Sequence, residues 1–163
     1  MSTHAGLNHS LIGAKSVIVA RMHVFTYGTL MFPQVWKAVV GREFVSVAGS
    51  AKGYAIYCVR DAVFPGIIAA GDRDAVCGVV YLDVDQASLA RLDLFEDDFY
   101  RRESLWVDCD DGERRAADAY VVPNENCAVL TEKTWRPDEF VASGGLDYFI
   151  RRFQGFERIE QQD

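Results

Sequence analysis

The sequence predicts one α+β domain in which short strands form a small barrel or a strongly curled sheet. Half of the 163 residues are hydrophobic and 12% are aromatic, which is enough for one compact core. Between residues 44 and 84, four short runs rich in β-branched and aromatic residues are separated by glycine or by polar turns. Helical signals lie before and after these runs. Such a succession is typical of a small barrel or a curled sheet.

The charge balance argues against nucleic-acid and membrane partners. There are 17 basic and 24 acidic residues, so the formal net charge is −7 and anionic surfaces are poor partners. No stretch approaches the roughly 18 apolar residues that span a bilayer. The cysteines form no C-x-x-C pair: they are Cys58, Cys77, Cys109 and Cys127. They predict small buried thiols in the reducing cytoplasm, and no metal site.

The first well-patterned segment begins at Met22. Residues 1–21 are predicted to be a poorly ordered extension, and residues 22–160 a single domain. The mildly apolar stretch 11–20 lacks the basic region that would precede it in a secretory signal. Residues 22–27 are rich in β-branched and aromatic types and predict the first strand.

A helix is predicted between Pro33 and Gly41, because proline suits the first helical position and glycine the position after the last. Four apolar residues between them recur at helical spacing: Val35, Trp36, Val39 and Val40. The four strands that follow are predicted over residues 44–49, 54–59, 63–70 and 76–84.

Asp85 is predicted to cap the next helix, which ends near Glu96. Its apolar side chains recur every three residues, at Leu89, Leu92 and Phe95. Two further strands, residues 104–108 and 116–122, are joined by a hairpin turn at Asp111-Gly112.

The C-terminal part is predicted as a loop over residues 124–136 and a last helix that starts at Pro137. Gly144-Gly145 weakens or kinks this helix. Its apolar side is predicted to carry Phe140, Val141, Tyr148 and Phe149.

The first candidate for chemistry is Tyr27-Gly28-Thr29-Leu30, which lies between the first strand and the first helix. Amide groups in such a turn can point at one spot, and a helix N-terminus adds partial positive charge there. Together they would form a cradle for a carboxylate or an oxyanion. By itself such a string is also typical of an ordinary turn.

The second candidate is the acidic segment at the end of the second helix. The helical phase directs Glu96 inward, against aromatic neighbours that would raise the pKa of its carboxyl by desolvation. A carboxyl tuned in this way can both take and give a proton near neutral pH. Asp97 and Asp98 can alternatively form a solvated acidic loop paired with Arg101 and Arg102.

A third segment, Phe64-Pro65-Gly66-Ile67, is interpreted as a turn or a strand kink, which could alternatively bring backbone close to a ligand. The sequence offers no Ser-His-Asp or Cys-His arrangement. It also has no phosphate loop and no G-x-G-x-x-G fingerprint, so ATP and nicotinamide cofactors have no support.

Five motifs in this order resemble the gamma-glutamylcyclotransferase-like superfamily. They span residues 22–122 and read Tyr27-Gly28-Thr29-Leu30, Phe64-Pro65-Gly66, Gly78-Val79-Val80-Tyr81, Leu92-Asp93-x-Phe95-Glu96 and Tyr100-Arg101. The superfamily includes the plant avirulence-induced proteins and the gamma-glutamylamine cyclotransferases. The resemblance implies a small mixed β-barrel flanked by helices, and no metal or organic cofactor.

The resemblance also implies roles for individual residues. The substrate loop of the family falls on Tyr27, Gly28, Thr29 and Leu30. Its catalytic glutamate falls on Glu96, and Tyr100 becomes a hydrogen-bonding partner in the site. One position departs from the family, because Asp97 stands where a glycine usually follows the glutamate.

The implied reaction releases 5-oxoproline and a free amine from a gamma-glutamyl amide. The α-amine of the substrate attacks its own γ-carbonyl, with Glu96 as general acid and base. Two alternatives stay open: a module that binds a small gamma-glutamyl carboxylate without turnover, and a hydrolase that uses water. The sequence does not distinguish among the candidate amines or among oligomeric states.

Overall fold

The computed structural model of the chain describes residues 21–162, so the prediction for residues 1–21 lies, but for Arg21, outside the described residues. Strand β1 (Met22–Thr26) leads through the short helix η1 (Thr29–Met31) into helix α1 (Pro33–Val40). Helix α1 ends where Gly41 adopts a left-handed backbone, with φ 72°. The predicted first strand and first helix are confirmed.

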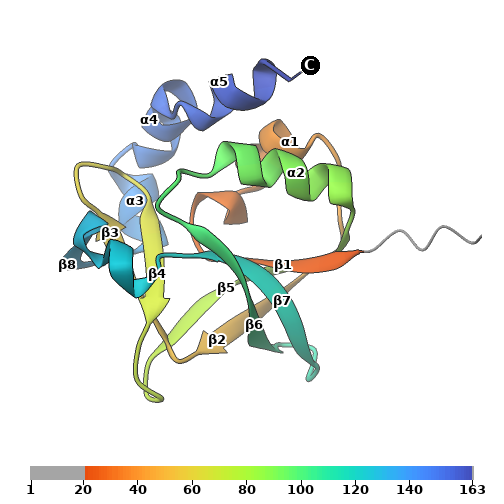
Figure 1. Cartoon of the computed structure of the whole chain (residues 1–163), viewed down its shortest axis with the longest axis vertical. Helices are drawn as coiled ribbons and strands as arrows, with labels where there is room; N and C mark the ends of the chain where they lie inside the picture. Colours follow the sequence, from red (N-terminus) through yellow and green to blue (C-terminus); the bar gives the residue numbers. More distant parts are fainter. Residues whose placement is uncertain (1–20, 163) are drawn as a thin grey trace, which may run out of the picture.

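Five strands form a closed barrel of mixed type (Figure 1). Their order is β1, β5 (Ala75–Val84), β2 (Ser46–Lys52), β6 (Arg101–Cys109) and β7 (Arg114–Val121). Neighbours pair antiparallel, and a parallel pairing of Val24 in β1 with Asp118 in β7 closes the barrel. The expected mixed barrel is therefore confirmed.

Three further strands extend the sheet beyond the barrel. Strand β4 (Pro65–Ala69) runs parallel to β7, and β3 (Tyr54–Val59) lies antiparallel between β4 and β8 (Leu130–Thr134). The loop predicted over residues 124–136 is wrong, because helix η2 (Asn124–Val129) and strand β8 occupy most of it. The β8 sequence is short and polar, and it becomes a strand by pairing with β3.

The helices lie against one end of the barrel, with α1, α2, α4 and α5 grouped together in Figure 1. Helix α2 (Gln86–Phe95) begins as predicted, since the Asp85 carboxylate accepts a 2.8 Å hydrogen bond from the Ser88 amide. The single C-terminal helix is wrong: the segment forms α3 (Pro137–Ala142), α4 (Gly145–Arg152) and α5 (Gly155–Glu160).

The C-terminal segment breaks at Gly144, whose φ of 78° is left-handed and ends the helical hydrogen-bonding pattern. The break rotates α4 relative to α3. Phe140 and Phe149 are buried as predicted, but Val141 and Tyr148 are 50% and 54% exposed. The expectation that all four residues face the core is therefore wrong for two of them.

The buried residues form two main groups. One fills the barrel and includes Phe25, Ile67 and Val107; the other lies between barrel and helices and includes Trp36, Leu92 and Phe95. All four cysteines are free thiols; Cys109 is buried as predicted, whereas Cys77 and Cys127 are exposed. Among residues 21–162, no helix is both long and apolar enough to cross a membrane.

Candidate active site

The Tyr27–Leu30 loop connects β1 to η1 at the end of the barrel that the helices cover. Gly28 lies so close to Pro65 that a Cβ atom there would come within 2.8 Å of the proline Cγ. The Met31 amide donates to the Gly28 carbonyl at 3.0 Å, and the Tyr81 hydroxyl donates to the Leu30 carbonyl at 3.2 Å. The first amides of a helix have no partner within it, and η1 begins at Thr29, inside this segment.

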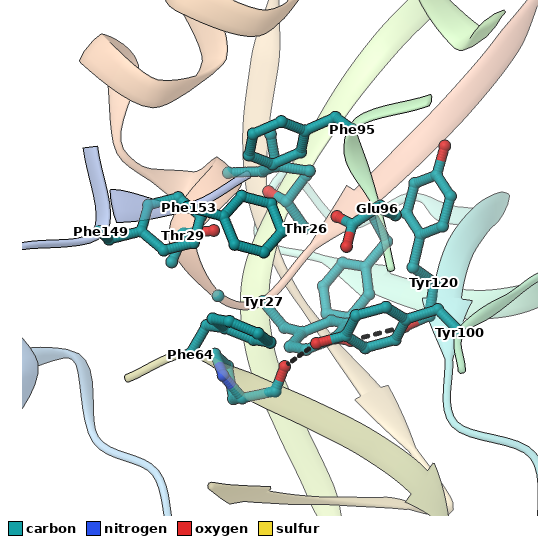
Figure 2. A pocket seen from close by; sticks show the side chains of 14 residues that line it. Thr26, Tyr27, Thr29, Phe64, Phe95, Glu96, Tyr100, Tyr120, Phe149 and Phe153 are labelled. Carbon is teal, nitrogen blue, oxygen red and sulfur yellow. Dashed lines mark hydrogen bonds between the residues drawn. The ribbon is translucent and has the colours of Figure 1, made fainter. Parts of the chain in front are cut away.

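Glu96 is the first residue beyond helix α2. Its amide still donates to the Leu92 carbonyl, but its backbone is extended, with φ −76° and ψ 147°. This change of direction takes the side chain off the helix surface, and the Glu96 carboxylate points into a pocket (Figure 2). The inward orientation that helical phase predicts is present.

The pocket brings together all six residues that the sequence singles out as site residues. Its 14 lining residues come from segments far apart in the chain. They are Phe25, Thr26, Tyr27, Gly28, Thr29, Leu30, Phe64, Pro65, Phe95, Glu96, Tyr100, Tyr120, Phe149 and Phe153. The pocket is narrow, with a cavity volume of about 30 Å³.

Tyrosine hydroxyls fix the polar side of the pocket. Tyr27 donates to the Tyr120 carbonyl at 2.5 Å, and Tyr100 donates to the Pro65 carbonyl at 2.5 Å, as the dashed lines in Figure 2 mark. The Tyr120 hydroxyl donates in turn to Asp93 at 2.7 Å. Burial, and then the nearby Glu96 charge, raise the pKa of Tyr27 well above its usual value, so the phenol stays neutral.

The Glu96 carboxyl is partly buried among these aromatic residues. Burial, and after it the neighbouring Asp97 charge, raise its pKa from an ordinary value of 4.5 to about 8. The Arg158 guanidinium opposes this rise, while Asp93 adds to it. A carboxyl with such a pKa exchanges a proton readily near neutral pH.

The ion pairs around Glu96 differ from those expected. Asp97 pairs with Arg158 at 3.2 Å, so its predicted pairing with Arg101 or Arg102 is wrong. Arg102 instead contacts Asp93 and Asp118, both at 3.1 Å. The partners of Arg101 are Glu103 and Glu125.

A wider acidic cleft lies on the other side of Glu96. Glu96, Tyr100 and Tyr120 line both this cleft and the pocket, and therefore separate the two spaces. The remaining residues of the cleft are charged: Asp93, Asp97, Asp98, Arg101, Arg102 and Asp118.

The sequence reasoning missed several residues of the site. Phe64 and Pro65 line the pocket, although neither side chain was among the predicted site residues. Phe149 and Phe153 enter from helix α4 and its end, and Arg158 approaches from α5. The sequence predicted a helix in this segment but not its contact with the pocket. In residues 21–162 no group of acidic, histidine or cysteine side chains is arranged to hold a metal ion.

The model of the family described as gamma-glutamyl cyclotransferase, AIG2-like, matches residues 24–137. The chain belongs to this family. Its barrel, its loop after β1 and its inward glutamate all lie within the matched residues. The helices α4 and α5, which bring Phe149, Phe153 and Arg158 to the site, lie outside them.

Individual relatives are distant. AIG2-like protein D of Arabidopsis thaliana is 33% identical over 87 residues, which is 53% of this chain and only 57% of that relative's length. The solution structure of another Arabidopsis thaliana protein has a TM-score of 0.64 at 23% identity, covering 87% of this chain and 85% of that one. The structure of a yeast gamma-glutamyl cyclotransferase specific to glutathione has a TM-score of 0.57 at 11% identity. The match covers 86% of this chain and 96% of the yeast chain. These two structures share the fold.

Proposed function

We propose that this protein is a cyclotransferase that cleaves a gamma-glutamyl amide into 5-oxoproline and a free amine. The observation that carries the proposal is the position of Glu96, whose carboxyl points into the pocket that the Tyr27–Leu30 loop lines. Membership of the family supports the general class of reaction. The same carboxyl has a pKa of about 8, which suits proton transfer in both directions.

In the proposed mechanism, the ionised Glu96 carboxylate first takes a proton from the α-ammonium of the substrate. The freed amine nitrogen attacks the γ-carbonyl carbon, a new C–N bond closes a five-membered ring, and the carbonyl oxygen becomes negative. The negative oxygen then re-forms the carbonyl, and the original amide C–N bond breaks as the Glu96 carboxyl gives its proton to the departing nitrogen. The new ring nitrogen still carries one extra proton, which Glu96 takes and passes to the freed amine, so that the products are neutral-ring 5-oxoproline and an ammonium ion. Every proton taken is given back, so no co-reactant is consumed.

The protein contributes chiefly by holding the substrate bent, because nucleophile and electrophile belong to one molecule. Restricting such a molecule to a reactive geometry removes much of the barrier. The amides at the start of η1 are the candidate donors to the negative oxygen or to the α-carboxylate. The hydroxyls of Tyr27 and Tyr100 already donate to carbonyls and keep the walls of the pocket in place.

The pocket, with a cavity volume of about 30 Å³, is narrow for a gamma-glutamyl group, so the aromatic side chains of its wall control access to Glu96 in this proposal. Phe149 is 2% exposed and firmly packed, whereas Phe153 is only partly buried at the end of α4. Of these two rings, we therefore propose that Phe153 is the one that limits access to Glu96.

The test is product identification in water enriched in ¹⁸O. The purified protein is incubated with gamma-glutamyl amides of neutral, cationic and aromatic amines, and the products are analysed by mass spectrometry. Cyclisation gives 5-oxoproline without ¹⁸O. Glutamate carrying ¹⁸O would instead indicate a hydrolase, and binding of intact amides without any product would indicate a binding module.

A further inference from the structure

Arg158 on helix α5 binds the chain on both sides of Glu96. Its Nε donates to the Leu94 carbonyl at 2.7 Å, and its Nη2 donates to the Phe95 carbonyl at 2.6 Å. The same Nη2 lies 3.2 Å from an Asp97 carboxylate oxygen. One guanidinium therefore contacts the two residues before Glu96 and the residue after it.

These contacts answer a specific need of helix α2. The last carbonyls of a helix have no partner within it, and they form the negative end of the helix dipole. A guanidinium offers several donors in a rigid planar arrangement and can satisfy two carbonyls and a carboxylate together. Without these hydrogen bonds the carbonyls at the end of α2 would face solvent, and the backbone at Glu96 could adopt other conformations.

Helix α5 is itself firmly packed against the end of α2. A Cβ on Gly155 would come within 2.3 Å of the Phe95 carbonyl oxygen, so the two backbones approach as closely as glycine permits. The Phe156 ring packs edge-on against Phe95 with centroids 5.0 Å apart, and the Arg158 guanidinium lies 5.6 Å from the centroid of the Phe153 ring. The guanidinium is thus held in place.

We propose that Arg158 is a positioning residue for Glu96, which holds the end of α2 and the Asp97 side chain so that the Glu96 carboxyl stays directed into the pocket. Asp97, which stands where the family usually has glycine, is its ionic partner. The proposal rests on the function proposed above, in which Glu96 moves the protons. It also gives the C-terminal helices, which lie outside the family match, a part in the reaction.

Several charged or titratable groups surround the Glu96 carboxyl. Asp93 and Asp97 come from its own segment, and Arg158 comes from α5. Three phenols face it: Tyr27 after β1, Tyr100 before β6 and Tyr120 in β7. The phenols stay neutral, so Arg158 and the two aspartates set the local charge.

The test compares Arg158→Gln, Arg158→Lys and Asp97→Asn with Arg151→Gln as the matched control. Arg151 is an exposed arginine of α4 whose guanidinium reaches only the Asp147 carbonyl of its own helix, at 3.3 Å, among the contacts of the described residues. Two quantities are measured in the full chain: kcat and KM for the best amide, and the pKa of the Glu96 carboxyl by ¹³C NMR.

Arg158→Gln is expected to lower kcat about tenfold or more with little change in KM, because the carboxyl loses its orientation while the pocket persists. It should raise the pKa of Glu96, whereas Asp97→Asn should lower it, since the two variants remove opposite charges. Arg158→Lys keeps the positive charge, so the pKa of Glu96 should stay close to its wild-type value. Its kcat should still be lower than that of the wild type, because an ammonium lacks the planar set of donors. Arg151→Gln should change neither quantity.

Loss of either charge alone shifts the pKa of Glu96, so the split between kcat and KM decides the role of Arg158. A purely structural role would lower the thermal stability of Arg158→Gln and leave kcat unchanged in the variant that stays folded at the assay temperature. Unchanged kcat and pKa in folded Arg158→Gln and Asp97→Asn would overturn the inference and leave the proposed function standing. Opposite pKa shifts in a protein that turns over no amide would overturn the proposed function, and with it the positioning role, while the proximity of Arg158 and Asp97 to Glu96 would stand.

Discussion

The Tyr100 hydroxyl donates a 2.5 Å hydrogen bond to the backbone carbonyl of Pro65 across the pocket. Tyr100 lies four residues after Glu96, and Pro65 begins strand β4 and contacts Gly28. One hydrogen bond therefore joins the segment that carries Glu96 to strand β4, which packs against the loop after β1. We expect this hydrogen bond to help set the distance between Glu96 and the loop.

Tyr100→Phe is expected to destabilise the fold by about 1–2 kcal/mol, because it leaves the Pro65 carbonyl without its partner. Turnover should fall more than stability alone explains, since the wall of the pocket loosens. Urea denaturation and kcat/KM measure the two effects. Tyr148→Phe is the control, because Tyr148 is 54% exposed, and its free energy of unfolding should change by less than about 0.5 kcal/mol.

The pH dependence of turnover should report the buried carboxyl. The base form of Glu96 is ionised, so kcat/KM should rise with pH and reach half its maximum near the Glu96 pKa of about 8. Steady-state rates from pH 5 to 10 measure this limb. A rising limb near the ordinary value of 4.5 would show a solvated carboxylate and contradict the burial argument.

Glu96 should make the free energy of unfolding fall as pH rises, whereas turnover should rise. The folded protein holds a proton on Glu96 up to about pH 8, whereas the unfolded chain releases it near 4.5. Since the folded state then binds more protons, the contribution of Glu96 to the free energy of unfolding falls as pH rises between these values. The slope for one proton is at most about 1.4 kcal/mol per pH unit.

Glu96→Gln carries no such proton and should lack this slope. Urea unfolding of both proteins at pH 5, 6, 7 and 8 compares them directly. Equal slopes in the two proteins would show that Glu96 titrates alike in the folded and unfolded states.

Local patterns predicted most of the elements that surround the site. Proline and glycine fix both ends of α1, and Asp85 caps α2 as its side chain suggests. The positions of the loop after β1 and of Glu96 follow from these elements. Closure of the barrel depends on the pairing of Val24 with Asp118, which no local pattern encodes.

The C-terminal contribution to the site could not be predicted for a related reason. Arg158 binds carbonyls and a carboxylate that lie 61 to 64 residues earlier in the chain. The direction of α5 depends on the breaks before α4 and α5, and small shifts there change which residues face α2. The sequence predicts that the last helix is weakened or kinked at Gly144-Gly145, but it does not predict the angle between the helices on either side.

Phe153→Ala should ease entry to the pocket. Removing the ring leaves room where a gamma-glutamyl group has to fit, so KM should fall by about threefold or more. We expect kcat to fall as well, because the Arg158 guanidinium loses the ring against which it lies. Water would also reach Glu96 and lower its pKa, which moves the rising limb of the pH profile to lower pH. Tyr148→Ala on the exposed face of α4 is the matched control and should change neither. An increase in KM for Phe153→Ala would show that the ring contacts substrate instead of blocking it.

The central claim is that Glu96 moves the protons of an intramolecular cyclisation. The most direct test measures 5-oxoproline formation by wild type, Glu96→Gln and Asp98→Asn, with calorimetric binding of the intact amide to Glu96→Gln. We expect Glu96→Gln to lose at least about 100-fold in kcat while it still binds the amide, and Asp98→Asn, which changes an exposed acid two residues away, to stay close to wild type. Undiminished 5-oxoproline formation by Glu96→Gln would contradict the account.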